Sequence, residues 1–305
     1  MIKKSVISKR ALKRASLLYV MISIPILWYI LFCYVPMGGL IIAFKKYSLF
    51  KGMIKSPWIG FAHFERFLTA PDFWKVLLNT MRLGALNLII CFPAPIILAL
   101  IINEIRGVRF KRFTQTVSYL PHFVSTAALT NILIVMLSPS LGVINNAITG
   151  LGFTSVNFIV EYVWFPAIYI FQLIWRDLGW GTIIYLAAIS GVDMEQYEAA
   201  AIDGAGRWLR MWHVTLPAIL PVISIMLILA VPSILGTDFE TVLLLQRPVT
   251  FETSDVVQTY IYRRGILNAE YDFTTAIHLV FSIFSITLIL ISNKVSSKLS
   301  GNGIW

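Results

Sequence analysis

Long apolar runs, separated by shorter polar segments, dominate this chain. Six of the runs reach about 20 residues, which is the length that an α-helix needs to cross roughly 30 Å of hydrocarbon. They cover residues 17–43, 77–102, 115–137, 163–190, 217–236 and 273–292. The pattern predicts an all-α membrane protein with six transmembrane helices.

The composition agrees with lipid as the solvent. Hydrophobic residues make up 58% of the 305 residues, charged residues make up 13%, and the mean hydropathy is +0.78. A soluble domain of this length could not keep so much apolar surface out of water. The net charge of +10 would suggest nucleic acid in a soluble protein. In a membrane protein, an excess of basic residues instead gathers in the loops on one side of the membrane. We therefore expect a lipid bilayer, and no nucleic acid, as partner.

The basic residues predict the direction of the helices. If the N-terminus is cytoplasmic, the inner segments hold more Lys and Arg than the outer ones and are shorter in total, as the positive-inside rule requires. The inner basic residues are Lys3, Lys4, Lys9, Arg10, Lys13, Arg14, Arg106, Arg109, Lys111, Arg112, Arg207, Arg210, Lys294 and Lys298. We therefore expect a basic cytoplasmic segment over 1–16, a membrane domain over 17–292, and a cytoplasmic tail over 293–305.

The segment 191–216 is polar and charged, yet it lies between two apolar runs. Asp193 can cap a short helix, and Gly204 can adopt the positive φ that ends it. Residues 207–213 then alternate charged with large apolar side chains, which suits a lipid interface. Pro217 fits the first turn of the next membrane helix. A short helix in this place is suited to be gripped by another protein, and the alternative is an ordinary solvated loop.

This segment resembles the signature loop of the permease subunits of ABC importers. The resemblance rests on the spacing of Glu198, Ala199, Ala200, Gly204, Val214, Leu216 and Pro217. Other stretches resemble carbohydrate-importing permeases of the maltose-transporter type and, among these, the lipoprotein-associated sugar permeases. Those stretches are residues 58–64, 73–80, 142–145, 174–180 and 184–188.

The resemblance implies a type I ABC importer permease fold in a bacterial cell membrane, with both termini cytoplasmic. It implies half of a translocation path, most simply for sugars or oligosaccharides. The implied partners are a second six-span permease, two ATP-binding subunits and an extracytoplasmic substrate-binding lipoprotein. The implied contacts with an ATPase come from Glu198, Ala199, Ala200, Asp203 and Gly204.

Enzymatic chemistry finds no support in the sequence. The chain has no Gly-x-x-x-x-Gly-Lys-[Ser/Thr] phosphate loop, and its four histidines are scattered. We therefore expect no catalytic, cofactor or metal site here, and we expect the partner ATPase subunits to use ATP and Mg²⁺.

Charged and amide side chains inside the runs are candidates for a substrate path. Arg176 and Asp177 interrupt the fourth run, where a lone charge costs roughly 2.5–3.5 kcal/mol, so they should face protein or water. Trp175, Gln172 and Asn131 are added because aromatic faces and polar groups suit sugar rings. The alternative is a structural ion pair with neighbouring helices.

Two other functions remain open at this point. The same architecture could carry a peptide, a polyamine or an anion. An ion-coupled secondary carrier would need titratable acids within its spans, and only Asp177 is clearly placed there, beside its own arginine.

Overall fold

The computed structural model describes residues 9–300, and these residues form helices joined by short loops. No strand is assigned in that range, where an isolated bridge pairs Lys45 with Trp58. The all-α class is therefore confirmed. Lys3, Lys4 and residues 301–305, which belong to the two predicted tails, lie outside the described residues.

Four helices are long and apolar enough to cross a membrane, or five if one bent pair counts as a single span. The four are Leu18–Phe44, Phe73–Glu104, Arg207–Ile234 and Tyr271–Lys298, and the bent pair joins Val108–Phe123 to Thr126–Met136. The fourth predicted run forms α10 (Phe165–Ser190), which is not among them. The number of six spans stays a prediction.

Three of the four long helices consist of consecutive segments, and the fourth is the single helix α17 (Tyr271–Ser300). In chain order these are α1 (Lys9–Tyr29), η1 (Ile30–Tyr34), α2 (Val35–Met37), η2 (Gly38–Phe44), α5 (Phe73–Leu86), η3 (Asn87–Cys91), α6 (Pro93–Glu104), α12 (Arg207–Arg210), η5 (Met211–Thr215), α13 (Leu216–Ala230), η6 (Val231–Ile234) and α17 (Tyr271–Ser300). The shorter elements are α3 (Gly52–Lys55), α4 (Ala62–Leu68), α7 (Val108–Tyr119), η4 (Leu120–Phe123), α8 (Thr126–Met136), α9 (Val143–Gly150), α11 (Met194–Ile202), α14 (Phe239–Leu245), η7 (Pro248–Thr250), α15 (Phe251–Ser254), α16 (Val257–Ile261) and η8 (Tyr262–Leu267).

Three of the π-helical segments, η1, η3 and η5, end two residues before a proline: Pro36, Pro93 and Pro217. In each case the residue just before the proline donates its N–H to the carbonyl five residues earlier. Proline has no N–H, and its ring collides with the carbonyl four residues earlier in an ordinary α-helix. The wider π turn accommodates the ring, so the span continues through the proline.

This accommodation corrects one predicted boundary. The fifth helix was expected to begin at residue 217, after a separate amphipathic segment, but the structure has one helix from Arg207 to Ile234. Because η5 absorbs the proline, the amphipathic residues form the first turns of the same helix.

The run over residues 115–137, predicted as one membrane helix, is broken into two helices. The chain bends there by 102° between Phe123 and Thr126. Pro121 lies within η4, and the Ser125 side chain accepts a hydrogen bond from the Ala128 N–H (3.2 Å), which starts α8 afresh. A run of apolar residues sets the depth of a segment in lipid, but it does not require that the segment be straight.

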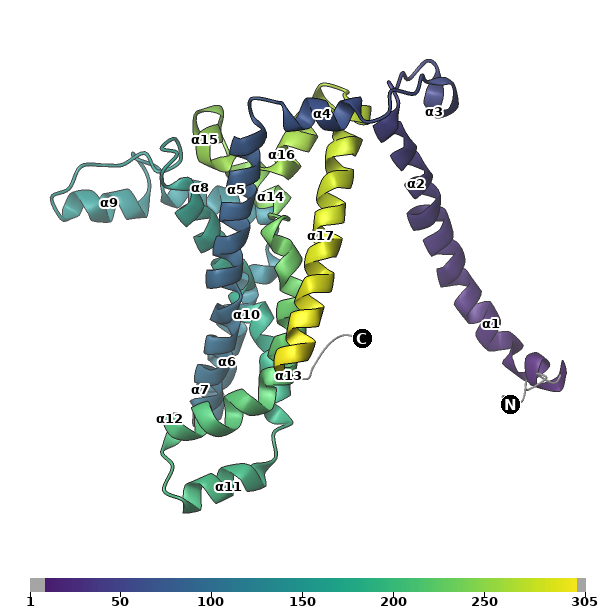
Figure 1. The fold of residues 1–305 in the computed structure, drawn as a ribbon. Helices are drawn as coiled ribbons and strands as arrows, with labels where there is room; N and C mark the ends of the chain where they lie inside the picture. The colour runs from purple at the N-terminus through teal and green to yellow at the C-terminus, as the bar shows by residue number, and fades with distance from the viewer. Residues whose placement is uncertain (1–8, 301–305) are drawn as a thin grey trace.

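Helix α10 occupies the centre of the bundle (Figure 1) and packs against α6, α7, α13 and α14. Eleven of its 26 residues are buried, and its side chains contribute to the largest apolar cluster of the core. By contrast, none of the most apolar window of Leu18–Phe44 is buried, and α1 leans away from the other helices (Figure 1).

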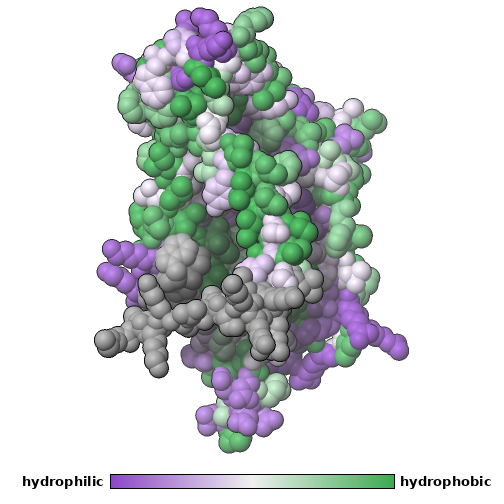
Figure 2. All heavy atoms as spheres, turned by 90° about the vertical axis from the view of Figure 1, so that its right-hand side faces the viewer, coloured by the Kyte–Doolittle hydropathy of each residue, from purple (hydrophilic) through white to green (hydrophobic). Residues whose placement is uncertain are grey.

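Helix α11 lies at one end of the molecule, where α1 begins and α17 ends, whereas α4, α15 and α16 lie at the opposite end (Figure 1). Figure 2 shows hydrophobic side chains over the middle of the molecule and hydrophilic ones gathered towards its two ends. This distribution matches a chain that crosses an apolar layer between two aqueous phases.

Candidate functional sites

Helix α11 is held in shape by caps at both ends. The Asp193 side chain accepts a hydrogen bond from the Glu195 N–H (3.0 Å), as the sequence predicts. At the other end Gly204 has φ +79°, and the Ala205 N–H reaches back to the Ala200 carbonyl at 2.9 Å. This arrangement is a Schellman motif, which needs the positive φ that glycine adopts at little cost.

The surface of α11 is acidic and exposed. Glu198, Ala199, Asp203 and Gly204 are exposed and Ala200 is half-buried. Residues 191–206 include four acidic and no basic residues. Every predicted ATPase-contact residue therefore lies on this short helix or on the turn that ends it, at one end of the bundle (Figure 1).

One hydrogen bond ties α11 to a membrane helix. The Tyr197 hydroxyl lies 2.8 Å from the Thr215 hydroxyl, and Thr215 is buried within η5. This hydrogen bond joins α11 to the π turn that precedes Pro217.

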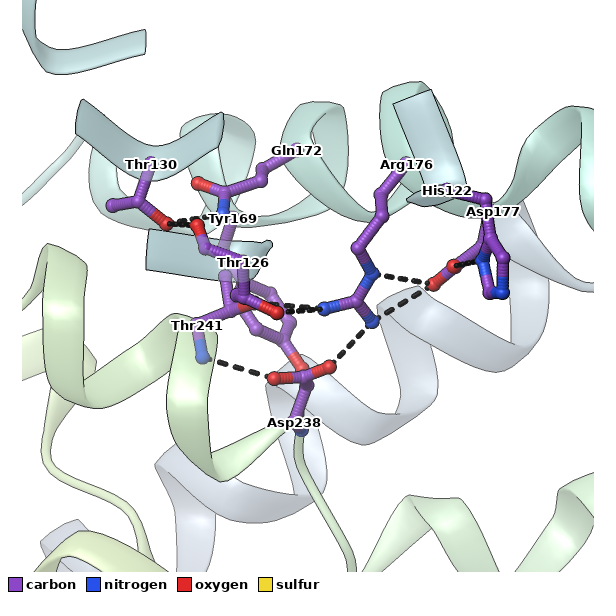
Figure 3. Close-up of polar contacts among 9 residues, drawn as sticks. All are labelled: His122, Thr126, Thr130, Tyr169, Gln172, Arg176, Asp177, Asp238 and Thr241. Carbon is purple, nitrogen blue, oxygen red and sulfur yellow. Dashed lines mark hydrogen bonds and ion pairs between the residues drawn. The ribbon is translucent and has the colours of Figure 1, made fainter. Parts of the chain in front are cut away.

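A charged cluster forms around Arg176 in the middle of α10 (Figure 3). Its guanidinium contacts the carboxylate of Asp177 at 2.8 and 3.0 Å and that of Asp238 at 2.5 Å. The remaining nitrogen donates to the hydroxyls of Thr126 and Thr241 at 3.3 and 3.4 Å. The ion pair with a neighbouring segment, one of the two readings of the sequence, is present, and every guanidinium nitrogen already has a protein acceptor.

Asp238 is positioned by its place before α14. Its second carboxylate oxygen accepts from the Thr241 N–H (2.9 Å) and so caps that helix. Its own N–H donates to the Tyr169 hydroxyl (3.0 Å), which belongs to α10. The cluster thus ties α10 to the loop between η6 and α14.

His122 joins the cluster from the bend between α7 and α8. Its Nδ1 lies 3.0 Å from the Asp177 carboxylate, and its ring stacks on Trp180 at a centroid distance of 4.4 Å. The close approach depends on Gly179, because a Cβ there would collide with the Ser118 backbone. A glycine on α10 therefore lets α7 come near enough for the contact.

A cavity of about 390 Å³ opens beside this cluster. Arg176, Asp177, Asp238 and Trp180 lie in its wall, together with residues of η3, α6 and α13. The carboxylates can accept hydrogen bonds from hydroxyl groups, and the indole supplies an apolar face. This chemistry suits a polyhydroxylated ring. Among residues 9–300, no group of three His, Cys, Asp or Glu could hold a metal ion.

The other predicted path residues lie elsewhere. Gln172 is fully buried and donates to the Thr130 hydroxyl at 2.5 Å, while its own carbonyl oxygen has no partner. Trp175 packs against the core cluster, and Asn131 is exposed on α8. None of these three lines the cavity. Their contact with substrate stays a prediction.

Sequence reasoning missed Asp238 and the contact of His122. Asp238 lies two residues beyond the predicted end of the fifth run. An acidic residue so close to a membrane boundary was the signal that could have identified it as a partner of Arg176. His122 follows Pro121, but the bend that turns it towards α10 has no signal beyond that proline.

Known proteins resemble this chain over almost its full length. A family described as the binding-protein-dependent transport system inner membrane component matches residues 91–298. Protein LplB of Bacillus subtilis (strain 168) is 43% identical, over 97% of this chain and 93% of its own. The polygalacturonan/rhamnogalacturonan transport system permease protein YteP of the same strain is also 43% identical, over 94% of this chain and 90% of its own.

Solved structures share the fold. A chain of a bacterial ABC transporter involved in the import of the acidic polysaccharide alginate superposes with a TM-score of 0.90. It is 39% identical, and the match covers 95% of this chain and 98% of that chain. A second structure, an alginate transporter in complex with an alginate pentasaccharide-bound periplasmic protein, also gives 0.90 at 38% identity, over 97% and 99% of the two chains.

Proposed function

Because the chain belongs to the family of binding-protein-dependent transport system inner membrane components, we propose that it is the permease subunit of an ATP-driven oligosaccharide importer. The match to the alginate transporter, at 39% identity over nearly the whole of both chains, carries this proposal. The protein is a multi-pass inner-membrane component of a sugar import system. Within that system it supplies half of the translocation path.

The cargo is an oligosaccharide that passes the cavity beside Arg176. Support comes from the relatives, whose names refer to polygalacturonan, rhamnogalacturonan and alginate. The cavity adds support, because two carboxylates and the indole of Trp180 line it. Because the guanidinium of Arg176 is held by these two carboxylates, it offers the cargo no unpaired cation, and sugar hydroxyls are better matched to this wall than sugar carboxylates.

The ATPase docks on α11. The helix is exposed, capped at both ends, acidic, and joined to a membrane helix through Tyr197 and Thr215. Glu198 would pair with a basic residue of the ATPase, and the small side chains of Ala199 and Ala200 permit close approach. Two ATP-binding subunits would use ATP and Mg²⁺, while this chain provides no catalytic residue and binds no cofactor.

The remaining partners are a second six-span permease and an extracytoplasmic binding lipoprotein. The relative solved with a periplasmic protein supports the latter. The most apolar window of the helix Leu18–Phe44 has no buried residue, so its surface is free to pack against the second permease. We place both termini in the cytoplasm, because the start of α1 and the end of α17 lie at the same end as α11 (Figure 1).

Reconstitution of the complete transporter in proteoliposomes tests the proposal. Uptake of a labelled oligosaccharide should require both ATP and the binding protein, and leaving out either one should reduce uptake at least tenfold. Uptake that persists without ATP but stops when an ion gradient is collapsed would assign the chain to the secondary carriers instead.

A further inference from the structure

A pocket of about 500 Å³ opens at the end of the molecule that carries α11. It lies where α6 and α10 end and where α11 and α12 begin. Arg106, Arg207 and Arg210 line it, and Glu104 is its acidic residue. We call it the arginine pocket.

The three arginines are unpaired. In the described part of the chain, none of them forms an ion pair. In contrast, Arg176 and Arg263 each contact at least one carboxylate within 3.0 Å. Three cations and one acid leave the pocket with a net positive charge, and no carboxylate of residues 9–300 forms an ion pair with these cations.

The pocket lies at the boundary of the apolar layer. The helix Phe73–Glu104 ends there and the helix Arg207–Ile234 begins there. Trp208 and Trp212, on the first turns of the latter, are 72% and 60% exposed. Exposed tryptophan is enriched at the depth of lipid headgroups, where the indole ring meets both apolar chains and water.

We propose that the arginine pocket binds the phosphate of an anionic phospholipid, with the acyl chains lying along the exposed apolar surface beside Trp208. Basic pockets between membrane helices suit such headgroups, because a partly desolvated phosphate takes several charge-assisted hydrogen bonds from arginine. The acidic surface of α11 stays outside the headgroup layer. The lipid then anchors the base of α11 on both sides, through α6 and α12.

Native mass spectrometry of the assembled transporter, titrated with phosphatidylglycerol or phosphatidylcholine in detergent, tests this proposal. Phosphatidylglycerol should bind at least tenfold more tightly than phosphatidylcholine. The triple variant Arg106→Gln, Arg207→Gln, Arg210→Gln should lose roughly 100-fold in affinity, since each cation near an anionic lipid is worth about a factor of five.

A matched triple variant provides the control. Arg109→Gln, Lys111→Gln and Arg112→Gln remove the same charge from α7 at the same end of the molecule, but outside the pocket. Water and salt screen those side chains, so lipid affinity should change less than threefold. Equal losses in the two triple variants would mean diffuse attraction and would overturn the proposal.

A second variant, which is expected to strengthen lipid binding, keeps the test valid if the pocket triple variant does not fold. Glu104→Gln removes the acid of the pocket and should raise the affinity for phosphatidylglycerol about fivefold, which a folding defect cannot do. Displacement of the lipid by millimolar glycerol 3-phosphate would identify a soluble phosphate as the ligand. Lipid binding that is seen only after the ATPase has been removed from the transporter would show that the pocket belongs to that interface. Either result would refute the lipid proposal.

Discussion

Two charged regions of this apolar chain, the cluster around Arg176 and the helix α11 with its terminal turn, differ in how their charges are paired. Around Arg176, the guanidinium is shared between two carboxylates and two hydroxyls, all supplied by the protein. On α11 and the turn that ends it, Glu195, Glu198 and Asp203 are exposed and form no ion pair within the described residues. A charge that is paired within the protein fixes how two segments lie against one another, whereas an unpaired charge exposed to water is available to another molecule.

The largest effect expected from this contrast is on stability. Arg176→Ala leaves Asp177 and Asp238 without their cation, and Arg176 is only 16% exposed in its side chain. Breaking a fully buried ion pair on one side costs about 3–5 kcal/mol, and because the side chains of Asp177 and Asp238 are 42% and 23% exposed, we expect a loss of about 1–3 kcal/mol. Thermal unfolding of the purified complex should show the loss as a lower midpoint temperature.

A compensated variant sharpens that result. Arg176→Met combined with Asp177→Asn and Asp238→Asn removes all three charges and keeps an asparagine cap for α14. It should recover most of the stability but not the transport rate. If Arg176→Ala alone melts like the wild type, the cluster does not hold α10 to the α14 loop.

On α11 we expect a charge substitution to weaken binding of the ATPase and to leave the stability of the protein unchanged. Glu198→Lys should leave the unfolding midpoint unchanged, because exposed substitutions change stability by less than about 0.5 kcal/mol. Affinity for the ATPase should fall roughly 30-fold, since a like-charge contact at an interface costs about 2 kcal/mol or more. Pull-down titration of the ATPase measures this loss. Gln196→Lys, which is exposed on another face of the same helix, should bind normally; equal losses would place the contact elsewhere.

A smaller effect is expected at the turn that ends α11. Gly204→Ala finds open space for its Cβ, so the strain comes from the positive φ alone and amounts to about 1 kcal/mol. ATP hydrolysis stimulated by the binding protein should fall about fivefold. Gly204→Asn tolerates this conformation better and should retain most of the activity. An unchanged rate in Gly204→Ala would mean that the shape of the turn is unimportant for coupling.

The smallest effect is expected at Asn131. It is exposed on α8 and does not line the cavity beside Arg176, so Asn131→Ala should change oligosaccharide uptake less than twofold. A tenfold loss with a normal unfolding midpoint would move the substrate path from the cavity to the surface of α8.

The sequence predicts the helical class, the capped helix at 194–202 and its glycine turn, because these depend on local rules of hydropathy and capping. It does not predict the bend at residues 123–126 or the partner of Arg176. Asp238 and Arg176 are 62 residues apart, and their contact depends on how α13 and α14 fold back against α10. Apolar periodicity carries no information about such pairings, since lipid and protein interior are equally apolar surroundings.

The π turns before Pro36, Pro93 and Pro217 have a consequence for length variation in this protein. Each holds one residue more than an ordinary turn would. Deleting a residue there would restore the common helical period and bring the proline ring against the carbonyl four residues earlier. These are therefore positions where a single deletion would kink or break the span at the proline, whereas an ordinary turn elsewhere in the helix holds no such extra residue.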